Sequence, residues 1–285
     1  MKVGLIGFGK TGRAVSSVLL HSRKTRLQWV MRRSRAPEQR SVAELLGVEA
    51  DEPGRIHSIH DMDAAELLDR HPVDAIIDFS SQDGISYYGA EAARRGIAII
   101  SAVSMYPESK LRLLRRLSRN TRVLHSPNIT LGVNFLIVAA KILKSIAPRV
   151  DIEIVEEHFK GKPEVSGTAK VIANTLGVPE EDIKTVRAGG IIGVHEILFG
   201  FPHQTVRLKH ESISREAFGA GILFAIENLP RQRAGLFSVE DLMRPYFNLG
   251  DDDGDDGQED DADDRRPGER PGERLAPPGL PVLRH

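Results

Sequence analysis

The chain has 285 residues, with 39 lysines and arginines against 40 aspartates and glutamates, so its formal net charge is −1. The absence of cysteine excludes a disulfide scaffold, thiolate metal sites and a cysteine nucleophile. No apolar run approaches the roughly 20 residues that span a bilayer, and residues 1–7 hold too short an apolar stretch for a secretory signal. We therefore expect a cytoplasmic protein.

The near-zero charge conceals two parts of opposite sign. Residues 251–285 contain twelve acidic residues against five arginines, a net charge of −7, which leaves +6 on the first 250 residues. The acidic part has almost no hydrophobic side chain before Leu275. Such a segment buries too little apolar surface to offset the entropy of ordering. We expect residues 250–285 to be a disordered acidic tail that aids solubility.

The first half of the chain alternates short apolar runs with helical patterns. Near-continuous apolar runs are typical of strands in a parallel sheet that is covered on both faces. Their alternation with helices predicts a Rossmann-type doubly wound parallel sheet, which forms a dinucleotide-binding domain over residues 1–128. The expected strands cover residues 3–6, 27–31, 73–79, 97–102 and 122–125, and the helices residues 12–20, 85–95 and 109–117.

The pattern changes after residue 128. A long helical pattern is followed by three strand-like runs with one convincing helix among them, which predicts a second α+β domain over residues 129–212 with a mixed or antiparallel sheet. A last helix, at residues 214–228 within a C-terminal segment 213–249, is expected to pack back on the first domain. The other helices are expected at residues 134–146 and 167–176, and the strands at residues 150–158, 191–199 and 204–212.

A glycine motif stands between the first predicted strand and the first predicted helix. Residues 7–12 read Gly-Phe-Gly-Lys-Thr-Gly, a G-x-G-x-x-G pattern. In this setting the first glycine permits a tight turn, the second lets the backbone approach a pyrophosphate, and the third lets helix and strand pack closely. The N–H groups at the helix start favour phosphate. The alternative is a glycine-rich turn without a ligand. The expected cofactor-binding residues are Gly7, Phe8, Gly9, Lys10, Thr11 and Gly12.

The end of the second predicted strand bears on the choice of cofactor. A preference for NAD usually goes with an acid about 20 residues after the motif, which binds the ribose hydroxyls. Residues 31–35 read Met-Arg-Arg-Ser-Arg, without an acid. Arg32 or Arg33 is suited to pair with a 2′-phosphate, so we expect NADPH, with NADH as the other option. A solvated basic loop is the alternative interpretation.

A second group of reactive residues follows the strand predicted at residues 150–158. His158 and Lys162 flank a glycine turn, and Ser-Gly-Thr at residues 166–168 opens the next helix. Hydroxyl and N–H groups at a helix start favour a carboxylate, so these residues are candidates for one anionic ligand. Structural roles for His158 and Lys162 are the alternative. His195 is expected to be a hydrogen-bonded sheet residue, and no histidine pair has metal-ligand spacing and context, so we expect no metal.

With these motifs in this order, the chain resembles the 4-hydroxy-tetrahydrodipicolinate reductase family, also called the dihydrodipicolinate reductase family. The resemblance covers most of residues 1–245 and rests on many short pieces. Beside the glycine motif, these are Asp-Phe-Ser at 78–80, Ser-Pro-Asn at 126–128, Gly-Val-Asn at 132–134, Asp-Ile-Glu-Ile at 151–154, Ser-Gly-Thr-Ala at 166–169, Val-Arg-Ala-Gly at 186–189, Gly-Val-His-Glu at 193–196 and Ser-Arg at 214–215.

The resemblance implies both an activity and an assembly. The activity is an NADPH-dependent reduction of a cyclic dicarboxylate imine, 4-hydroxy-tetrahydrodipicolinate to tetrahydrodipicolinate, in lysine and diaminopimelate biosynthesis. The second domain would bind substrate and form a homotetramer. Histidine suits the proton relay and lysine the stabilisation of negative charge. The residues implied are His158 and Lys162 for catalysis, Ser166, Gly167, Thr168 and Arg215 for substrate binding, and Phe79, Ser80, Ser101 and Asn128 around the nicotinamide.

Parts of the chain depart from the family pattern, which is E-x-H-H-x-x-K followed by D-A-P-S-G-T. The second histidine is Phe159, residues 163–165 form a link one residue shorter than usual, and a Gly-Thr-Thr-Gly loop has become Ser-Ala-Val-Ser at 101–104. These changes leave two alternatives, a related amino-acid or imine dehydrogenase and a non-catalytic NADP-binding protein. An aromatic content of 5% without a binding motif disfavours a nucleic-acid binder.

Overall fold

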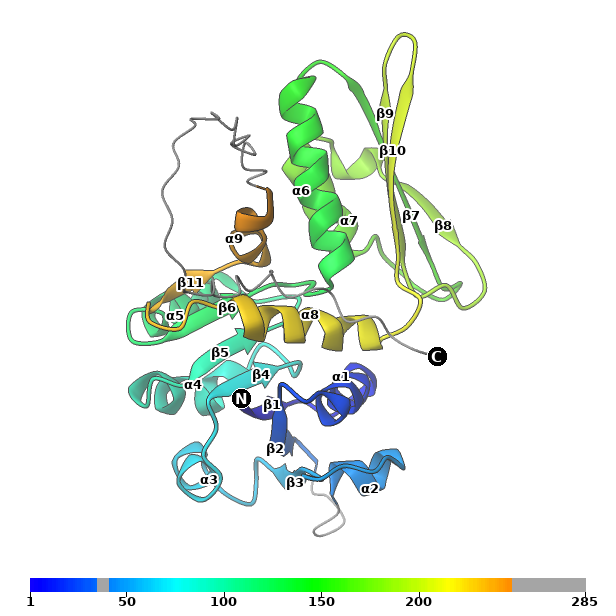
Figure 1. The fold of residues 1–285 in the computed structure, drawn as a ribbon. Helices are drawn as coiled ribbons and strands as arrows, with labels where there is room; N and C mark the ends of the chain where they lie inside the picture. The colour runs from blue at the N-terminus through cyan, green and yellow to red at the C-terminus, as the bar shows by residue number, and fades with distance from the viewer. Residues whose placement is uncertain (35–40, 248–285) are drawn as a thin grey trace, which may run out of the picture. The chain divides into compact units, whose positions relative to one another are not determined.

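The computed structural model describes residues 1–34 and 41–247 (Figure 1). The acidic tail predicted for residues 250–285 lies outside the described residues. Within the described ranges, every helix is too short or too polar to cross a membrane.

The first sheet has seven strands, all paired in parallel, in the order β11-β6-β5-β4-β1-β2-β3. The chain leaves β1 toward one edge and returns beside it as β4, so the strand order reverses between β1 and β4. In open α/β sheets, ligands bind at the carboxyl ends of the strands beside such a reversal. The strands are β1 (Lys2–Ile6), β2 (Arg26–Arg32), β3 (Arg55–Ser58), β4 (Ala75–Asp78), β5 (Ala98–Ser101), β6 (Arg122–His125) and β11 (Gly235–Phe237).

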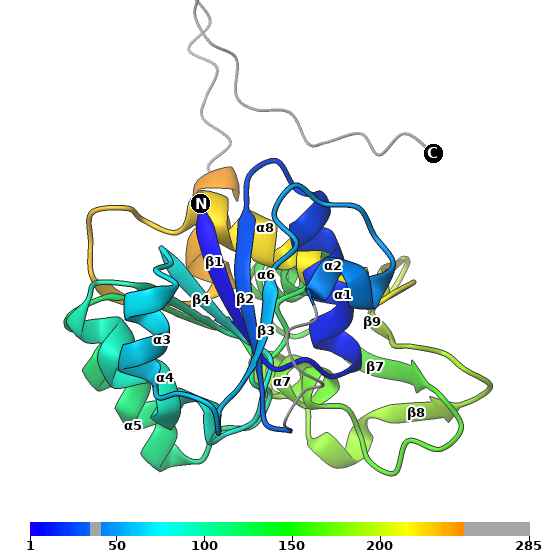
Figure 2. The same ribbon diagram turned by 90° about the horizontal axis from the view of Figure 1, so that it is seen from below.

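Helices cover both faces of this sheet, as the apolar strands predict. Successive strand residues point to opposite faces, and Ile76 and Ile77 accordingly belong to different apolar clusters. Figure 2 shows α1 and α2 on one side of the sheet and α3, α4 and α5 on the other. The predicted doubly wound Rossmann-type sheet is confirmed. The helices are α1 (Lys10–His21), α2 (Val42–Leu46), α3 (Ala64–Arg70), α4 (Gly84–Arg94) and α5 (Glu108–Leu117).

The second sheet has four strands in the order β10-β9-β7-β8. β7 pairs with β9 and β9 with β10 in antiparallel fashion, whereas β7 and β8 are parallel, so the sheet is mixed, as predicted. Two helices, α6 and α7, pack on one face around Leu136, Ile154 and Ile197 (Figure 1). The elements are α6 (Leu131–Ile146), β7 (Asp151–His158), α7 (Gly167–Leu176), β8 (Lys184–Arg187), β9 (Val194–Gly200) and β10 (Thr205–Glu211).

The helix expected at residues 214–228 is α8 (Glu216–Asn228), and it packs along α1. The approach is close, because a Cβ atom at Gly219 would lie 2.6 Å from the Cβ of Val18. At Gly221 a Cβ atom would overlap the carbonyl oxygen of Ile129, just before α6. The helix α9 (Val239–Met243) follows β11, and its Leu242 belongs to the apolar cluster that contains Ile77. The glycines of α8 thus let this helix pack closely on α1, which covers the first sheet, and on the residues just before α6.

Replacing Gly221 with alanine tests this close packing. Alanine normally stabilises a helix interior relative to glycine by about 1 kcal/mol. Here we expect the opposite sign, a loss of about 1–3 kcal/mol in the free energy of unfolding, because the backbone has to shift. Gly190→Ala is the control, since a Cβ atom there meets no atom within 4 Å. Denaturant unfolding measures both variants, and a Gly221→Ala protein as stable as wild type would contradict the packing.

Candidate active site

The glycine motif forms the turn between β1 and α1. Gly7 has a φ of +99°, and a Cβ atom on it would lie 2.7 Å from the backbone carbonyl of Phe79. A Cβ atom on Gly12 would overlap the carbonyl oxygen of Gly7. The Gly7 N–H donates to the carbonyl of Met31, 2.8 Å away, which fixes the turn beside the end of β2. Glycine is therefore required at both positions by contacts of the fold itself.

Gly9 differs from the other two glycines because its surroundings are open. It is the N-cap residue of α1, has no side-chain cap, and a Cβ atom on it would meet no atom within 4 Å. The first turn of α1 contains no acidic residue. A helix start with unsatisfied N–H groups and the positive end of the helix dipole attracts phosphate. This end of α1 therefore fits the pyrophosphate of a dinucleotide, with the backbone of Lys10 and Thr11 beside it.

A cleft of about 530 Å³ lies over the carboxyl ends of the central strands. Phe79 and Ser80 follow β4 and line the cleft, and Phe218 of α8 packs edge-to-face on Phe79 with ring centroids 6.1 Å apart. Nothing in the sequence singled out Phe218, because only the tertiary fold brings α8 to this cleft. The lining residues are Thr11, Phe79, Ser80, Ser81, Gln82, Ala102, Val103, Ser104, Met105, Pro127 and Phe218.

Two residues expected to contact the cofactor have buried side chains. Phe8 is 8% exposed and belongs to the core under α1, with the Arg13 guanidinium 5.3 Å from its ring centroid. Ser101 is fully buried, and its Oγ lies 2.9 Å from the hydroxyl of Tyr106. Both side chains therefore pack within the fold, the role of these two residues in cofactor binding stays a prediction, and residues 102–104 line the cleft.

A buried carboxyl group supports the floor of this cleft. Asp78 accepts hydrogen bonds from the N–H of Ser80 at 2.8 Å, from the Ser80 hydroxyl at 2.6 Å and from the Tyr88 hydroxyl at 2.9 Å. Burial raises the pKa of Asp78 above its usual range, although these hydrogen bonds oppose the shift. These hydrogen bonds hold Ser80 in place just after the carboxyl end of β4.

The two arginines proposed for a 2′-phosphate lie at the end of β2, beside the glycine turn. Arg32 is half-buried, and its Nε donates to the carbonyl of Ser34 at 2.9 Å. Arg33 is exposed. The structure therefore places both residues at the carboxyl end of β2, next to the glycine turn.

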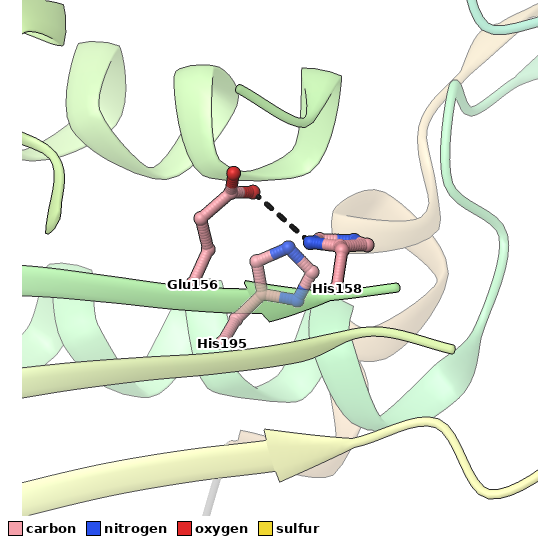
Figure 3. A group of neighbouring side chains, drawn as sticks. All are labelled: Glu156, His158 and His195. Carbon is pink, nitrogen blue, oxygen red and sulfur yellow. Dashed lines mark ion pairs between the residues drawn. The ribbon is translucent and has the colours of Figure 1, made fainter. Parts of the chain in front are cut away.

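His158, from the second group of candidates, lies at the end of β7 with Glu156 and His195 beside it (Figure 3). Strand alternation places Ile154, Glu156 and His158 on one face, which α7 covers. His158 is 7% exposed, and its Nδ1 lies 3.4 Å from Oε2 of Glu156, which has no exposed surface. His195 stands opposite Glu156 on β9, and its ring meets the His158 ring edge-on with centroids 5.5 Å apart.

The N-terminus of α7 is bonded to this group through Ser166. The Ser166 N–H donates to Oε2 of Glu156 at 3.0 Å, and its Oγ caps the helix by accepting from the Ala169 N–H. The same Oγ lies 3.0 Å from Nε2 of His195, which is 4% exposed. His195 is therefore a hydrogen-bonded residue of the sheet, as predicted. Gly167 is the first residue of α7 and is exposed.

One hydrogen bond links the two groups of candidates. Asn128, just after β6 in the first sheet, donates from Nδ2 to Oγ1 of Thr168 in α7 at 2.9 Å. Its Oδ1 accepts from both the N–H and the hydroxyl of Thr130. Asn128 therefore holds the start of α7 beside the carboxyl ends of the strands in the first sheet.

Glu156 and Arg187 are site residues to which the sequence assigned no role. Arg187, the last residue of β8, places Nη2 2.6 Å from Oε1 of Glu156. Its Nε donates to the carbonyl of Lys162 and its Nη2 to the carbonyl of Glu164. The available signal was Glu156 itself, an acid on the apolar face of a predicted strand, which requires a buried partner. Nothing in the polar segment around Arg187 identified that partner.

The surroundings keep both histidines largely neutral. Burial lowers the pKa of His158, the positive charges of Lys162 and Arg187 lower it further, and Glu156 opposes them. Burial, with His158 beside it, lowers the pKa of His195 to about 4. Burial favours the neutral form of Glu156, but hydrogen bonds from Ser166 and Arg187 outweigh it and leave the pKa of this carboxyl below its usual range.

The charges at this group favour an anion over a cation. Glu156, His158 and His195 each offer a ligand-type atom, and these atoms lie within 4.8 Å of one another. Arg187 and half-buried Lys162, however, place two positive charges beside them. The absence of a metal site therefore stays a prediction, and the group is better suited to hold a proton next to a negatively charged ligand.

Arg215 is the one proposed substrate residue that is not joined to this group by a contact among the described residues. It is exposed at the N-cap position of α8. Lys162, by contrast, affects the pKa of both His158 and His195, so its charge lies close to them.

Comparison with known proteins identifies the family. Residues 1–129 match the family described as "Dihydrodipicolinate reductase, N-terminus", and residues 129–243 match "Dihydrodipicolinate reductase, C-terminus". The 4-hydroxy-tetrahydrodipicolinate reductase of Caldanaerobacter subterraneus subsp. tengcongensis is 32% identical over 197 residues, which cover 61% of this chain and 78% of that protein. The enzyme of the same name from Thermosipho africanus is 28% identical over 65% of this chain and 86% of its own length.

Solved structures share the fold. The structure "Dipicolinate bound Dihydrodipicolinate reductase from Paenisporosarcina sp. TG-14" superimposes with a TM-score of 0.69 at 19% identity, covering 84% of this chain and 97% of that one. An amine dehydrogenase from Mycobacterium smegmatis gives 0.57 at 10% identity, covering 86% and 95%. The resemblance predicted from the sequence is confirmed: the chain belongs to the dihydrodipicolinate reductase family and is an NAD(P)H-dependent oxidoreductase.

Proposed function

We propose that the protein reduces a cyclic dicarboxylate imine with NADPH, converting 4-hydroxy-tetrahydrodipicolinate to tetrahydrodipicolinate in lysine and diaminopimelate biosynthesis. The observation that carries this proposal is the position of His158, in a buried pair with Glu156, beside Lys162 and the start of α7. Asn128, at the end of the first sheet, donates to Thr168 at this helix start with an Nδ2–Oγ1 distance of 2.9 Å. The helix start beside this proton source and positive charge is thereby joined to the residue that follows Pro127 of the cofactor cleft.

The cofactor is proposed to bind across the carboxyl ends of β1, β4 and β5. The open helix start at Gly9 suits the pyrophosphate, and Phe79 and Ser80 in the cleft suit the nicotinamide end. Arg32 and Arg33 are proposed to bind a 2′-phosphate, which supports NADPH over NADH. An acidic residue at this position would instead repel the 2′-phosphate.

The substrate is proposed to place one carboxylate on the N-terminus of α7. Gly167 and Thr168 lie in its first turn, where N–H groups and the helix dipole favour an anion. Lys162 adds a positive charge for the second carboxylate and for the negative charge that develops during reduction. A relative of known structure is described as dipicolinate-bound, and that aromatic dicarboxylate has the negative charges that this site suits.

His158 is proposed to deliver the proton. Loss of the 4-hydroxyl group as water gives the conjugated imine, to which a bound nicotinamide would supply a hydride, and the electron density that accumulates on the substrate then requires a proton. Neutral His158 gains that proton more readily once an anionic substrate lies beside it, because opposite charge raises a pKa. Its Nδ1 faces Glu156, which leaves Nε2 for the transfer.

A related imine or amino-acid dehydrogenase is the second candidate. Phe159 stands where the family has a second histidine, and its side chain is 44% exposed next to the proposed site. An apolar ring at that place favours a substrate with less charge than a dicarboxylate. Activity on such an imine, with none on the dicarboxylate, would identify this candidate.

The domain roles, assembly and location are also proposals. Residues 1–128 are proposed to bind the cofactor, residues 129–212 to bind substrate and form a homotetramer, and residues 213–249 to return to the nucleotide domain, in a cytoplasmic enzyme. One face of the second sheet is covered by α6 and α7, whereas Val186 on β8 is 43% exposed. Family membership and this exposed apolar side chain support an assembly through the second domain.

Removing the proton donor and the lysine tests the reaction. Wild-type protein is mixed with NADPH and the condensation product of pyruvate and aspartate semialdehyde, and loss of the reduced cofactor is followed by absorbance. His158→Ala and Lys162→Ala are each expected to lower kcat by about 10²- to 10⁴-fold, as for other general acids and charge-stabilising groups. Binding of NADPH, measured by fluorescence, should not change. His60→Ala, at an exposed position, is the control. Full activity in either site variant would refute the assigned roles.

The activity should fall as the pH rises. His158 has to be protonated to donate, and its pKa lies below the ordinary value, so the descending limb of kcat/KM is expected near or below neutral pH. A profile measured across buffers of constant ionic strength gives this limb. An activity that increases steadily up to pH 9 would exclude His158 as the proton donor.

Replacing both arginines with serine tests the choice of cofactor. The Arg32→Ser/Arg33→Ser protein should lose affinity for NADPH by about tenfold or more, since charged hydrogen bonds contribute about 1.5–3 kcal/mol. Its affinity for NADH should stay within about twofold of wild type. Equal losses for both cofactors, or a wild-type preference for NADH, would contradict the 2′-phosphate assignment. Arg23→Ser, on the exposed loop before β2, is the matched control.

A further inference from the structure

Glu156 carries a charge at a place where the fold provides almost no water. The residue has no exposed surface and lies between the apolar Ile154 and the ring of His195. An unpaired carboxylate in such surroundings is strongly destabilising, so its partners have to compensate for the lost hydration. Two of those partners, His158 and Ser166, are proposed site residues, and the third is Arg187 of β8.

Each oxygen of Glu156 contacts a different part of the site. Oε1 receives Nη2 of Arg187 at 2.6 Å. Oε2 receives the Ser166 N–H at 3.0 Å and lies 3.4 Å from Nδ1 of His158. The carboxylate therefore lies between the proposed proton donor and the helix start proposed to bind substrate.

Arg187 extends the same connection to the loop between β7 and α7. Its guanidinium donates to the carbonyl oxygens of Lys162 and Glu164, at 3.2 Å and 3.0 Å. These bonds fix the backbone that carries the lysine side chain. The pair formed by Glu156 and Arg187 thus joins four segments: β7, β8, the loop and α7.

The ring of His158 is confined on its other side as well. A Cβ atom on Gly193 would lie 3.2 Å from Nε2 of His158, so glycine at this position keeps side-chain atoms away from that nitrogen. Nδ1 has no hydrogen-bond partner at the present 3.4 Å separation, and such bonds commonly tighten when a ligand binds. A proton on Nδ1 directed at Glu156 leaves Nε2 as the nitrogen open to the substrate.

We propose that Glu156 and Arg187 are positioning residues of the active site. Their ion pair orients His158 with Nδ1 toward the carboxylate and aligns the lysine loop with the N-terminus of α7. This inference rests on the proposed reductase function, in which His158 delivers a proton to a bound dicarboxylate. Neither residue touches the substrate in this account.

The charged and titratable groups around His158 come from every neighbouring element. Glu156 faces it from β7, Arg187 from β8, His195 from β9 and Lys162 from the loop. Beyond them, His210 of β10 stands opposite His195. Glu156 carries the one negative charge in this group, so its loss makes protonation of the imidazole harder.

Two variants and a conservative replacement test the pair. In Glu156→Gln, kcat is expected to fall about tenfold or more at neutral pH, because a neighbouring carboxylate typically raises a pKa by about one unit or more. The descending limb of the pH profile should move to lower pH. In Arg187→Met, the loop and α7 lose their connection, so KM for the dicarboxylate should rise as well. Arg187→Lys should restore most of kcat but not KM, since lysine pairs with Glu156 without reaching both loop carbonyls.

The control is a second ion pair on the opposite face of the same sheet. Arg207 and Glu196 lie 2.6 Å apart on β10 and β9, away from the site. Glu196→Gln should leave kcat, KM and the pH profile within twofold of wild type. Thermal unfolding and NADPH binding of every variant show whether the protein is folded. If Glu156→Gln does not fold, Arg187→Lys decides the proposal alone. In that variant most of kcat should be restored, whereas KM should stay raised.

A measurement without substrate separates this inference from the proposed function. Nitrogen NMR of labelled histidine, with His158 assigned from a His158→Gln spectrum, reports which ring nitrogen is protonated. We expect the proton on Nδ1 in wild type and Glu196→Gln, and a population shift toward Nε2 in Glu156→Gln. A changed tautomer in an enzyme that does not reduce the dicarboxylate would preserve the positioning role and refute the function. An active wild type whose tautomer, kcat and KM are the same in Glu156→Gln would overturn the positioning role.

Discussion

The burial of one carboxylate constrains four segments around the candidate site: β7, β8, the loop after β7 and the start of α7. Glu156 lies on the apolar face of its sheet, where a charge persists only with partners that replace water. Arg187 supplies the opposite charge, and Ser166 supplies a backbone N–H from the next helix. Strand β8, the loop after β7 and the start of α7 therefore have to take their observed positions for the carboxylate to stay ionised. A buried ion pair of this kind contributes little to the free energy of unfolding, but it fixes the relative positions of the segments that it joins.

The same constraint gives the site its chemical character. Lys162, Arg187 and the positive end of α7 converge on a small region, while Glu156 balances part of their charge. A site with surplus positive charge and a weakly basic histidine suits an anionic substrate that requires a proton during its reduction. The 250 residues before the acidic tail carry a net charge of +6, so the field around this part of the molecule also favours the approach of a polyanionic cofactor and substrate.

The sequence was most informative where one physical requirement determines one pattern. Fully buried parallel strands need apolar runs, and the glycine turn needs Gly7 and Gly12, so five strands of the first sheet and its glycine turn were predictable. Strands β3, β8 and β11 were missed because they are three or four residues long, and β3 and β8 are largely polar. Their pairing comes from neighbouring strands and not from their own composition. Arg187 and Phe218 were missed for the same reason, since each reaches the site only through tertiary packing.

Isotope labelling shows whether a hydride passes from the cofactor to a dicarboxylate beside His158. NADPH carrying deuterium at C4 of the nicotinamide is incubated with the protein and the condensation product of pyruvate and aspartate semialdehyde, and the product is analysed by mass spectrometry and proton NMR. We expect one deuterium from the cofactor on a ring carbon of tetrahydrodipicolinate. Oxidation of the cofactor without label in that product, or tight binding of NADPH with no reduction at all, would contradict it.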